Sequence, residues 1–322
     1  MAVEDSKQRP RPTFSEIPTL EEGESKNKEL VLTLPVEQGW VASAIRQHQG
    51  FWVWERVLPG ILTMQEVFKH DPNDIIVASL PKSGTTWLKA LTFTIVHRSK
   101  FSFSDHPLLK FNPHDCVPVL DHTYAGLVEQ NLKILPSPRV LGTHTPYSFL
   151  PEIVKTSDCP IIYLCRETKD VLVSFWHMLS ARNSIPFNQA FELFCEGRAP
   201  YGPIWDHVLE YYTISLHNQK KVLFLKYEEM MNDPIEAVTR LADFIGCPFT
   251  EEEVKQNVVV KVVEFCSFNK LKDLDVNKNN SKNDFLFRKA VVGDWQNYIT
   301  AEMATKLDKI TEERLQDSGF TY

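Results

Sequence analysis

Hydrophobic residues gather along the chain in short β-branched runs, and each run is followed by a polar loop and a segment of helical period. The first run covers residues 74–78 and leads into a helix predicted over 86–96. Further runs lie at 139–144, 160–165 and 221–226. Short apolar runs bounded by turns are typical of buried strands, and their alternation with helices indicates parallel βαβ units. The predicted fold class is α/β, a single domain with a central parallel sheet and helices on both faces.

The remaining pattern predicts further helices and two irregular segments. Asp233 followed by Pro234 is a typical helix start, with an N-cap and then proline at the first helical position. The other helices are predicted at 57–68, 166–178, 258–268 and 301–315. Prolines and polar residues argue against regular structure over 108–120, and the lysine- and asparagine-rich stretch 270–284 is predicted to be a mobile loop or lid.

The first 28 residues differ from the rest in composition. Residues 1–28 are rich in proline and acidic residues, and they lack both a signal-peptide core and the basic character of a transit peptide. We expect a disordered tail over 1–28 and one domain over 29–322. The aromatic residues Phe51 and Trp52 near the start of that domain fit either ordinary core or the wall of an apolar acceptor pocket.

Composition narrows the classes of function. The 322 residues are 43% hydrophobic and 24% charged, with a net charge of −7, which argues against nucleic-acid or membrane partners. No stretch reaches the roughly 20 apolar residues that cross a bilayer. Six scattered cysteines without metal-ligand spacing favour a reducing, cytoplasmic location and no metal site.

Residues 79–87 form a strand–loop–helix junction with the character of an anion site. Gly84 allows close approach of the backbone, and helix N-termini carry free N–H groups and partial positive charge. The side-chain donors of this loop are Lys82, Ser83, Thr85 and Thr86. A Walker A loop requires Gly, four residues and then Gly-Lys-Ser/Thr, so this P-loop-like segment excludes an ordinary ATPase or kinase.

Two other strand ends carry candidate site residues. His144 closes the run 139–144 at the edge where open α/β sheets bind ligands, and it is a candidate general base or a structural histidine. Arg166 ends the run 160–165 and is suited to a phosphate or to a surface ion pair. Later in the chain, Arg288 and Lys289 follow an apolar anchor and suit a second phosphate.

The segment Pro-Lys-Ser-Gly-Thr-Thr-Trp-Leu, together with Thr-His-x-Pro around His144 and the late Arg-Lys pair, resembles the plant-type cytosolic sulfotransferase family from about Leu32 to the C-terminus. The resemblance implies 3′-phosphoadenosine 5′-phosphosulfate (PAPS) as the sulfonate donor and 3′-phosphoadenosine 5′-phosphate (PAP) as the product. It implies that the 5′-phosphosulfate is held by Lys82, Ser83, Gly84, Thr85 and Thr86. It implies a 3′-phosphate site of Arg166, Ser174, Arg288 and Lys289, and an adenine site of Trp87, Tyr227, Cys266 and Phe268.

The same resemblance implies a reaction. His144 is the catalytic base that removes a proton from an acceptor hydroxyl, and Lys82 stabilises the charge that develops during in-line transfer. The implied acceptor is a small, largely apolar molecule, with a flavonoid, a steroid such as a brassinosteroid, hydroxyjasmonate or a desulfoglucosinolate left open. The alternatives are a nucleotide-binding homologue without turnover and, less favoured for lack of a Walker A loop, a kinase of related architecture.

Four departures from the family pattern are visible, three at single positions and one in a motif. Gly142 stands where animal members often carry lysine, Ala290 replaces a glycine, and Cys266 replaces a threonine. Of the animal dimer motif Lys-x-x-x-Thr-Val-x-x-x-Glu, only Thr300 remains among Gln296, Thr300, Ala301 and Thr305. The loss of the dimer motif predicts a monomer. The changes at Gly142, Ala290 and Cys266 affect, in that order, one cationic contact, one backbone contact and one contact to the adenine.

Overall fold

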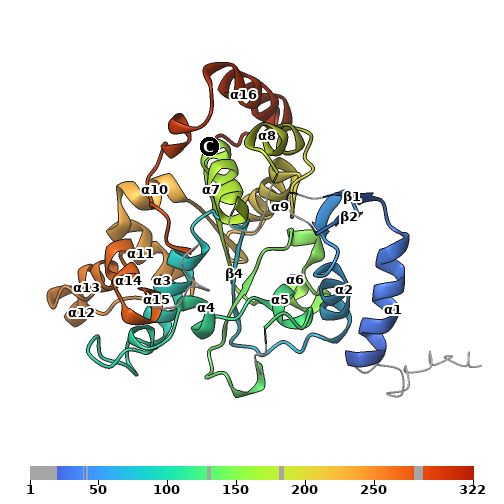
Figure 1. The fold of residues 1–322 in the computed structure, drawn as a ribbon. Coiled ribbons are helices and arrows are strands. Elements are labelled where there is room, and N and C mark those ends of the chain that lie inside the picture. The colour runs from blue at the N-terminus through green and yellow to red at the C-terminus, as the bar shows by residue number, and fades with distance from the viewer. Residues whose placement is uncertain (1–19, 39, 41–42, 129–131, 181–184, 279–285) are drawn as a thin grey trace, which may run out of the picture.

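The protein is built around a four-stranded parallel sheet (Figure 1). The structure is a computed structural model, and it describes residues 20–38, 40, 43–128, 132–180, 185–278 and 286–322. The strands of the sheet are β4 (Ile75–Ser79), β5 (Val140–Thr143), β6 (Ile161–Cys165) and β7 (Val222–Lys226). They pair in the order β5-β4-β6-β7, and every pair is parallel. The predicted α/β fold is therefore confirmed, and all four predicted strands are present.

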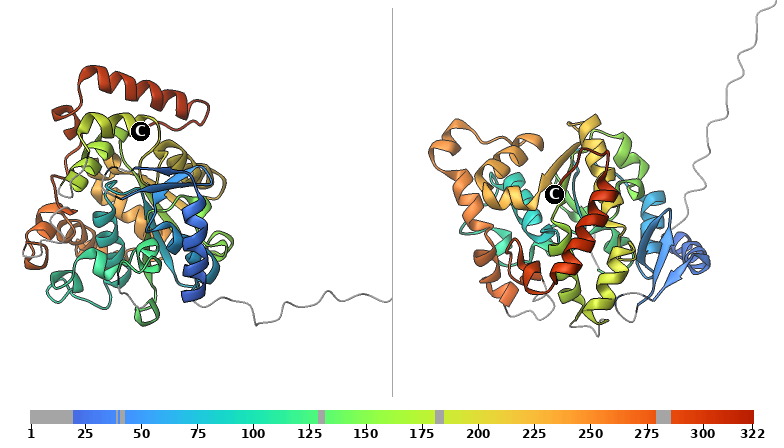
Figure 2. Two further views of the ribbon diagram at one scale, coloured as in Figure 1. Left: turned by 45° about the vertical axis from the view of Figure 1, so that its right-hand side comes forward. Right: turned by 90° about the horizontal axis from the view of Figure 1, so that it is seen from above.

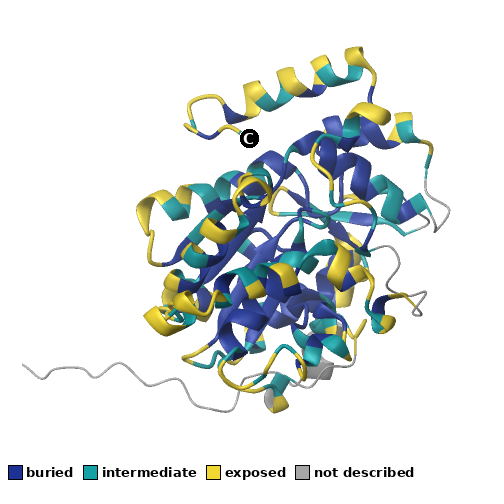
Figure 3. Cartoon of the chain, turned by 90° about the vertical axis from the view of Figure 1, so that its left-hand side faces the viewer, coloured by how far each residue is buried: buried dark blue, intermediate teal, exposed yellow. Residues whose placement is uncertain are grey.

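Side chains alternate across the strands and divide the core into two layers, because successive residues of a strand point to opposite faces. Ile75 and Val77 pack with α3, α11 and α13, whereas Ile76 and Ala78 pack with α2, α7, α8 and α9. Helices thus cover both faces of the sheet. The strands are buried at the centre, and exposed residues lie on the outer faces of the helices (Figure 3).

The helices that cover the sheet include six that were predicted, α2, α3, α7, α11, α13 and α16, and five that were not, α6, α8, α9, α10 and α12. Their bounds are α2 (Leu58–Val67), α3 (Thr85–His97), α6 (Glu152–Thr156), α7 (Thr168–Ser180), α8 (Phe187–Cys195), α9 (Ile204–His217), α10 (Tyr227–Asn232), α11 (Pro234–Phe244), α12 (Glu251–Lys255), α13 (Val258–Phe265) and α16 (Ala301–Leu315). The side chain of Asp233 caps α11 by accepting from the N–H of Glu236, as the Asp-Pro pair predicts. Helix α16 packs against α9 on the outside (Figure 2). No helix of the described ranges is long and apolar enough to cross a bilayer.

Two segments predicted to be irregular contain short helices. The segment 108–120 overlaps η1 (Pro107–Leu109), α4 (Pro113–Cys116) and the start of α5 (Leu120–Tyr124). Helix α4 forms because Asn112 and Asp115 make a reciprocal capping box around a proline at the first turn. The predicted loop 270–284 begins inside α14 (Phe268–Lys272) and includes α15 (Asp275–Lys278), and residues 279–285 lie outside the described ranges. The helix predicted over 258–268 is interrupted, because Ser267 caps the start of α14.

The N-terminal part of the described chain is also more ordered than predicted. Helix α1 (Leu20–Thr33) packs against α2, so the prediction of a disordered tail is wrong for residues 20–28, while residues 1–19 lie outside the described ranges. Three short antiparallel strands follow, β1 (Val36–Glu37), β2 (Ile45–His48) and β3 (Phe51–Trp54). The remaining 3-10 turns are η2 (Leu132–Ile134), η3 (Tyr147–Phe149) and η5 (Asp294–Asn297).

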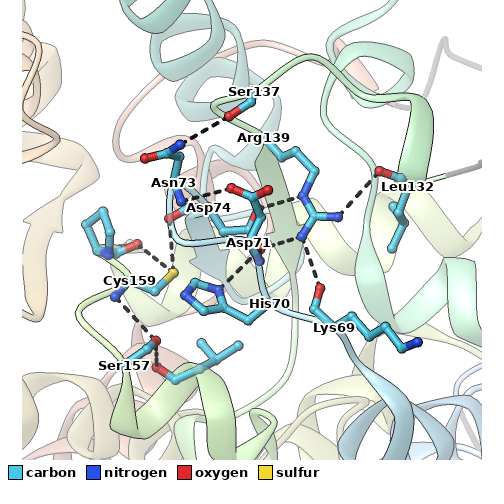
Figure 4. A network of polar contacts seen from close by, with 12 residues as sticks. Lys69, His70, Asp71, Asn73, Asp74, Leu132, Ser137, Arg139, Ser157 and Cys159 are labelled. Carbon is cyan, nitrogen blue, oxygen red and sulfur yellow. Dashed lines mark hydrogen bonds and ion pairs between the residues drawn. The ribbon is translucent and has the colours of Figure 1, made fainter.

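A buried ion pair fastens the amino ends of β4 and β5. Arg139 donates through Nε and Nη2 to the two carboxylate oxygens of Asp74, each across 2.6 Å (Figure 4). The carboxylate also accepts from the N–H of Asp71 at 2.9 Å, and the side chain of Asp74 is fully buried. Two parallel hydrogen bonds between ionised groups fix geometry as well as charge. This pair joins the central strand β4 to the edge strand β5 at their amino ends.

Candidate active site

Each of the four parallel strands ends at a residue that lines one large cavity. Lys82 follows β4, His144 follows β5, Arg166 follows β6 and Tyr227 follows β7, and all four line a cavity of about 780 Å³. The chain passes from β4 to β5 on one side and then crosses to β6 on the other side of β4. Ligands of open α/β sheets bind at the carboxyl edge where the strand order reverses in this way.

The loop between β4 and α3 is shaped by two residues with positive φ. Lys82 has φ +72° and Gly84 has φ +103°, and Gly84 is the N-cap of α3. A Cβ at residue 84 would lie 2.8 Å from the ring of Tyr227 and 3.1 Å from Leu164, so both the conformation and the space require glycine. Inside the turn, the hydroxyls of Ser79 and Thr85 are hydrogen-bonded at 2.6 Å.

Three cations from distant parts of the sequence converge on this loop. Burial, followed by the nearby charges of Arg288 and Arg166, lowers the pKa of Lys82 to about 7. Arg166 is itself buried, with its guanidinium 4.7 Å above the ring of Tyr227 and Nη1 3.4 Å from the carbonyl oxygen of Lys82. Among the described residues, no Asp or Glu lines the cavity. Such a concentration of positive charge is suited to an anion with more than one charge.

Two carboxylates behind the cavity hold Arg166, Arg288 and Lys289 in place. Asp170 accepts from Nη2 of Arg166 at 3.1 Å and from the N–H groups of Gly293 at 2.8 Å and Trp295 at 3.0 Å. Asp294 accepts from Arg288 at 2.5 Å and from Lys289 at 2.8 Å. Burial would raise the pKa of Asp294, but the hydrogen bonds from Lys289, Arg288 and Asn297 outweigh it and lower this pKa to about 2.

Several buried donors around the cavity have no hydrogen-bond partner among the described residues. They are Ser83 Oγ, Trp87 Nε1, Arg166 Nε and Arg288 Nε. Buried polar groups are nearly always satisfied, so donors left open in one place indicate a bound ligand. All four belong to the set that sequence analysis assigned to the donor nucleotide. Their open hydrogen bonds, with the surrounding cations, fit a phosphorylated ligand.

The histidine at the end of β5 is held in one tautomer. His144 Nδ1 lies 2.8 Å from the carbonyl oxygen of Ser79, which can only accept, so Nδ1 carries the hydrogen and Nε2 keeps its lone pair. Burial, opposed by Asp121, lowers the pKa of His144 to about 4, so the ring is neutral at pH 7. The main-chain carbonyl of His144 accepts from His207 Nε2 at 3.0 Å. A neutral imidazole with a fixed lone pair is suited to accept a proton.

A buried carboxylate supports this strand end, and sequence analysis did not single it out. Asp121 accepts from the N–H of His144 at 3.1 Å and from the hydroxyl of Tyr201 at 2.6 Å. Burial would raise the pKa of Asp121, but His122, His144 and the hydrogen bond from Tyr201 outweigh it and lower the pKa. The signal available in the sequence was only an acid directly after the segment 108–120, which was predicted to be irregular.

Three of the residues that line the cavity near α10 and α14 are aromatic. Trp87 packs edge-on against Tyr227 with ring centroids 5.8 Å apart, and Phe268 lies on the same wall. Cys266 and Ser174 also line the cavity; burial raises the pKa of the Cys266 thiol to about 12, and its sulfur lies 3.4 Å from the hydroxyl of Thr94. Of the thirteen residues predicted for the donor site, only Ser83 does not itself line the cavity.

The rest of the cavity lining is mostly apolar. It includes Trp54, Val57, Val119, Phe175, Met178, Leu179 and Tyr201. The alternative that Phe51 and Trp52 form an acceptor wall is not supported, because Phe51 packs against Phe149 and His207 in the core and Trp52 is absent from the lining. Trp52 and Trp54 point to the same side of β3, because side chains alternate along a strand. Of the two, Trp54 lines the cavity.

Two of the departures from the family pattern acquire a structural explanation. Ala290 lines the cavity and has φ +54°, so this position does adopt the left-handed conformation in which glycine is favoured. At Gly142, a Cβ would lie 2.7 Å from Cε and 2.9 Å from Nζ of Lys89, a fully buried lysine of α3. Lys89 thus fills the space beside Gly142 with a cationic group from a different element, and this lysine does not line the cavity.

Comparisons with known proteins identify the family. The family model described as a sulfotransferase domain matches residues 72–319. Cytosolic sulfotransferase 5 of Arabidopsis thaliana is 42% identical over 317 residues, covering 94% of this chain and 98% of the relative. The flavonol 3-sulfotransferase of Flaveria bidentis is 42% identical over 287 residues, covering 85% of this chain and 91% of the relative.

Solved structures give the same result. A crystal structure of an Arabidopsis thaliana sulphotransferase matches with a TM-score of 0.76 at 39% identity, covering 91% of this chain and 94% of that chain. A mouse sulfotransferase complexed with PAP matches with a TM-score of 0.67 at 27% identity, covering 85% of this chain and 95% of that chain. The chain belongs to the plant cytosolic sulfotransferase family and is a PAPS-dependent sulfotransferase.

Proposed function

We propose that this enzyme transfers the sulfonate group of PAPS to a hydroxyl of a small, largely apolar acceptor, with His144 as the general base and Lys82 stabilising the developing charge. The observation that carries the proposal is that the neutral, tautomer-fixed imidazole of His144 and the ammonium of Lys82 line one cavity. The lining of this cavity contains both a set of cationic side chains and a larger set of apolar side chains. Such a cavity suits an anionic donor and an apolar acceptor bound at once.

The chemistry follows from these groups. As the acceptor oxygen attacks sulfur, its proton passes to Nε2 of His144, an O–S bond forms, and the bond from sulfur to the 5′-phosphate oxygen breaks. PAP and the sulfated acceptor are the products, and the proton on His144 returns to solvent. Negative charge grows on the leaving phosphate, where Lys82 and the N-terminus of α3 offer preorganised positive charge. No step uses a metal ion, so chelators should not affect the rate.

The proposed donor site uses the groups that the protein leaves open. The 5′-phosphosulfate lies against Lys82, Ser83, Gly84, Thr85 and Thr86, and the 3′-phosphate lies against Arg166, Ser174, Arg288 and Lys289. The adenine lies among Trp87, Tyr227, Cys266 and Phe268. The open donors of Arg166 and Arg288, which both line the cavity, support this placement, because a phosphate supplies several acceptor oxygens at once.

The acceptor class is inferred from the apolar part of the cavity lining. Trp54, Phe175 and Tyr201 offer aromatic surface there, and Met178 adds an adaptable side chain. This lining favours a flat, largely apolar molecule. Flavonoids, steroids such as brassinosteroids, hydroxyjasmonate and desulfoglucosinolates remain the candidates, and one relative is named a flavonol 3-sulfotransferase. We place the enzyme in the cytoplasm, as the relatives' names state for them, with no nucleic-acid or membrane partner.

We also propose a monomer. The one residue kept from the animal dimer motif, Thr300, is the N-cap of α16 and accepts from the N–H of Met303 at 3.2 Å, which gives this threonine a role within one chain. Light scattering at micromolar protein should give the mass of a single chain, and a dimer mass would contradict the proposal.

The experiment that tests the function is a transfer assay. The protein is incubated with sulfur-labelled PAPS and a panel of flavonols, brassinosteroids, other steroids, hydroxyjasmonate and desulfoglucosinolates, with and without EDTA. Transfer of label to at least one class, unchanged by EDTA, supports the proposal. Binding of donor with no transfer to any member would favour a homologue without turnover, with Ala290 as its suspected cause, and loss of transfer with EDTA would contradict the metal-independent scheme.

A further inference from the structure

A buried lysine and a histidine that the proposed chemistry does not use lie directly behind the donor loop. Lys89, on α3, is fully buried, and its Nζ lies 2.9 Å from the carbonyl oxygen of Val117 and 3.1 Å from Nδ1 of His114. The other ring nitrogen of His114, Nε2, lies 3.0 Å from the hydroxyl oxygen of Thr86. His114 and Thr86 line the cavity, whereas Lys89 does not. The three side chains thus form a continuous chain from the interior to the proposed phosphosulfate site.

The chemistry of these groups gives the chain a direction. An ammonium has only hydrogens to offer, so Nζ of Lys89 donates to Nδ1 of His114, and the ring hydrogen must sit on Nε2. Nε2 then donates to the oxygen of Thr86. Because that oxygen is already accepting, the hydroxyl hydrogen of Thr86 is free to point into the cavity. Burial, followed by the charge of Lys89, holds the pKa of His114 well below its usual value, which agrees with a ring that carries one hydrogen.

Lys89 keeps positive character despite its burial. Burial lowers its pKa to about 7, and the nearby carboxylates of Asp121 and Asp115 oppose that effect. An anion bound at the other end of the chain would favour the charged form further. The direction of the chain and the charge of the proposed ligand therefore support one another.

We propose that Lys89 and His114 are positioning residues that fix the hydroxyl of Thr86 as a hydrogen-bond donor toward the 5′-phosphosulfate. This inference rests on the proposed donor placement. It also explains Gly142, because any side chain at that position would occupy the space of the Lys89 ammonium. With the opposite direction, Thr86 would present lone pairs to an anion, which would repel the ligand.

A merely structural role is the competing explanation. Lys89 joins α3 to the segment that carries α4, so its removal destabilises the fold whether or not it acts on Thr86. Lys221 offers a matched control, because it is also buried and its Nζ also donates to carbonyl oxygens, those of Val154 and Ser157, away from the cavity. Comparison of Lys89→Met with Lys221→Met separates the two explanations.

The first test reads the tautomer directly. The protein is labelled with ¹⁵N-histidine, and the ring signals of His114 are identified by their absence in His114→Gln. We expect Nε2 to carry the hydrogen and Nδ1 to be unprotonated. A hydrogen on Nδ1 would overturn the proposal, whatever the binding data show.

The second test is a double-mutant cycle on PAP affinity, measured by calorimetry on folded protein. Lys89→Met and Thr86→Val should each weaken PAP binding about tenfold, the worth of one hydrogen bond to a charged group, and the double variant should bind no worse than the weaker single variant. Thr86→Ser should restore binding to within about twofold, and Lys221→Met should leave it unchanged. His114→Gln provides a second route if Lys89→Met does not fold.

The outcomes distinguish a failure of the directed hydrogen-bond chain from a failure of the proposed donor placement. Independent losses that multiply in the double variant, or an equal loss in Lys221→Met, would overturn the directed chain while leaving the donor placement intact. A wild-type protein that fails to bind PAP would overturn the donor placement itself, and the tautomer would still report on the direction of the chain.

Discussion

Arg166 and Asp170 lie one helical turn apart and form a buried ion pair at 3.1 Å, and the same carboxylate accepts the N–H groups of Gly293 and Trp295. Asp170 thereby connects the helix that follows β6 with the segment that carries Arg288. Arg166 adds a second connection, because its Nη2 donates to the carbonyl oxygen of Val291 at 2.8 Å. The basic residues proposed for the 3′-phosphate are therefore held together by the carboxylate of Asp170 and the carbonyl group of Val291, two groups that a nucleotide need not touch.

The first prediction concerns Arg288. Replacement by Gln removes a charged contact to the proposed 3′-phosphate, worth roughly 1.5–3 kcal/mol, so PAP affinity should fall about 10- to 150-fold. The variant Arg98→Gln is the control, because that arginine pairs with Glu253 and does not line the cavity. Calorimetric titration with PAP measures both. Equal affinities for wild type and Arg288→Gln would refute the placement of Arg288.

The second prediction follows from the lowered pKa of Lys82. In the free protein this pKa is about 7, so the ammonium has mostly lost its proton at pH 8. A bound phosphate favours the charged form, so binding at pH 8 should take up a proton, and PAP affinity should fall as the pH rises above 7. Calorimetry in buffers of different ionisation enthalpy measures this uptake. Lys82→Met should lose the part of this uptake that belongs to Lys82, while Lys89, whose pKa is also about 7, keeps its own part; uptake of the same size in the variant would assign the whole uptake to Lys89 or another group.

The third prediction concerns the pair at the amino ends of β4 and β5. Asp74→Ala leaves the charge of Arg139 without its buried partner and should lower the free energy of unfolding by about 3 kcal/mol or more. The exposed pair of Lys155 and Glu152 serves as the comparison, and Glu152→Ala should cost less than about 1 kcal/mol. Urea titration followed by circular dichroism measures both. A similar small loss in the two variants would show that the buried pair does not anchor the sheet.

The fourth prediction concerns Ala290. Because its φ is +54°, a β-branched side chain there is strained, and Ala290→Val should destabilise the segment by about 1–2 kcal/mol and weaken PAP binding. Glycine accepts this conformation, so Ala290→Gly should bind PAP at least as well as wild type. Titration of both variants with PAP provides the measurement. Tighter binding by Ala290→Val would contradict this reasoning.

The sequence was sufficient for the elements whose cause is local. The strand–loop–helix at 79–87 and the Asp-Pro start of α11 depend on neighbouring residues, and both were predicted at their observed positions. Helices α4 and α1 were missed because their stabilisation is less visible. A capping box supports α4, and α1 is polar along most of its length and packs against α2.

The supporting residues of the site required the tertiary structure. Sequence analysis named Arg288 and Arg166, yet nothing in the spacing connects Asp170 with Gly293, which are 123 residues apart. In the same way, only the structure shows that the space beside Gly142 is filled by Lys89 of α3. Of these residues, Asp294 would have been the easiest to identify from the sequence, because it follows the Arg-Lys pair closely.

The fifth prediction concerns His144, whose imidazole accepts the acceptor's proton in the proposed reaction. Loss of a general base costs typically 10²–10⁴-fold in rate, so His144→Ala should lose turnover by at least that order, while the PAP affinity stays within about twofold of wild type. His217→Ala is the control, because His217 is exposed and hydrogen-bonded within its own helix.

The most direct test of the account is therefore the rate of labelled sulfonate transfer from PAPS to the best acceptor of the panel, measured for wild type and for His144→Ala on protein with matched PAP affinity. The account predicts rapid transfer by wild type and a loss of at least about a hundredfold in the variant. Transfer by His144→Ala within a few-fold of wild type would contradict it.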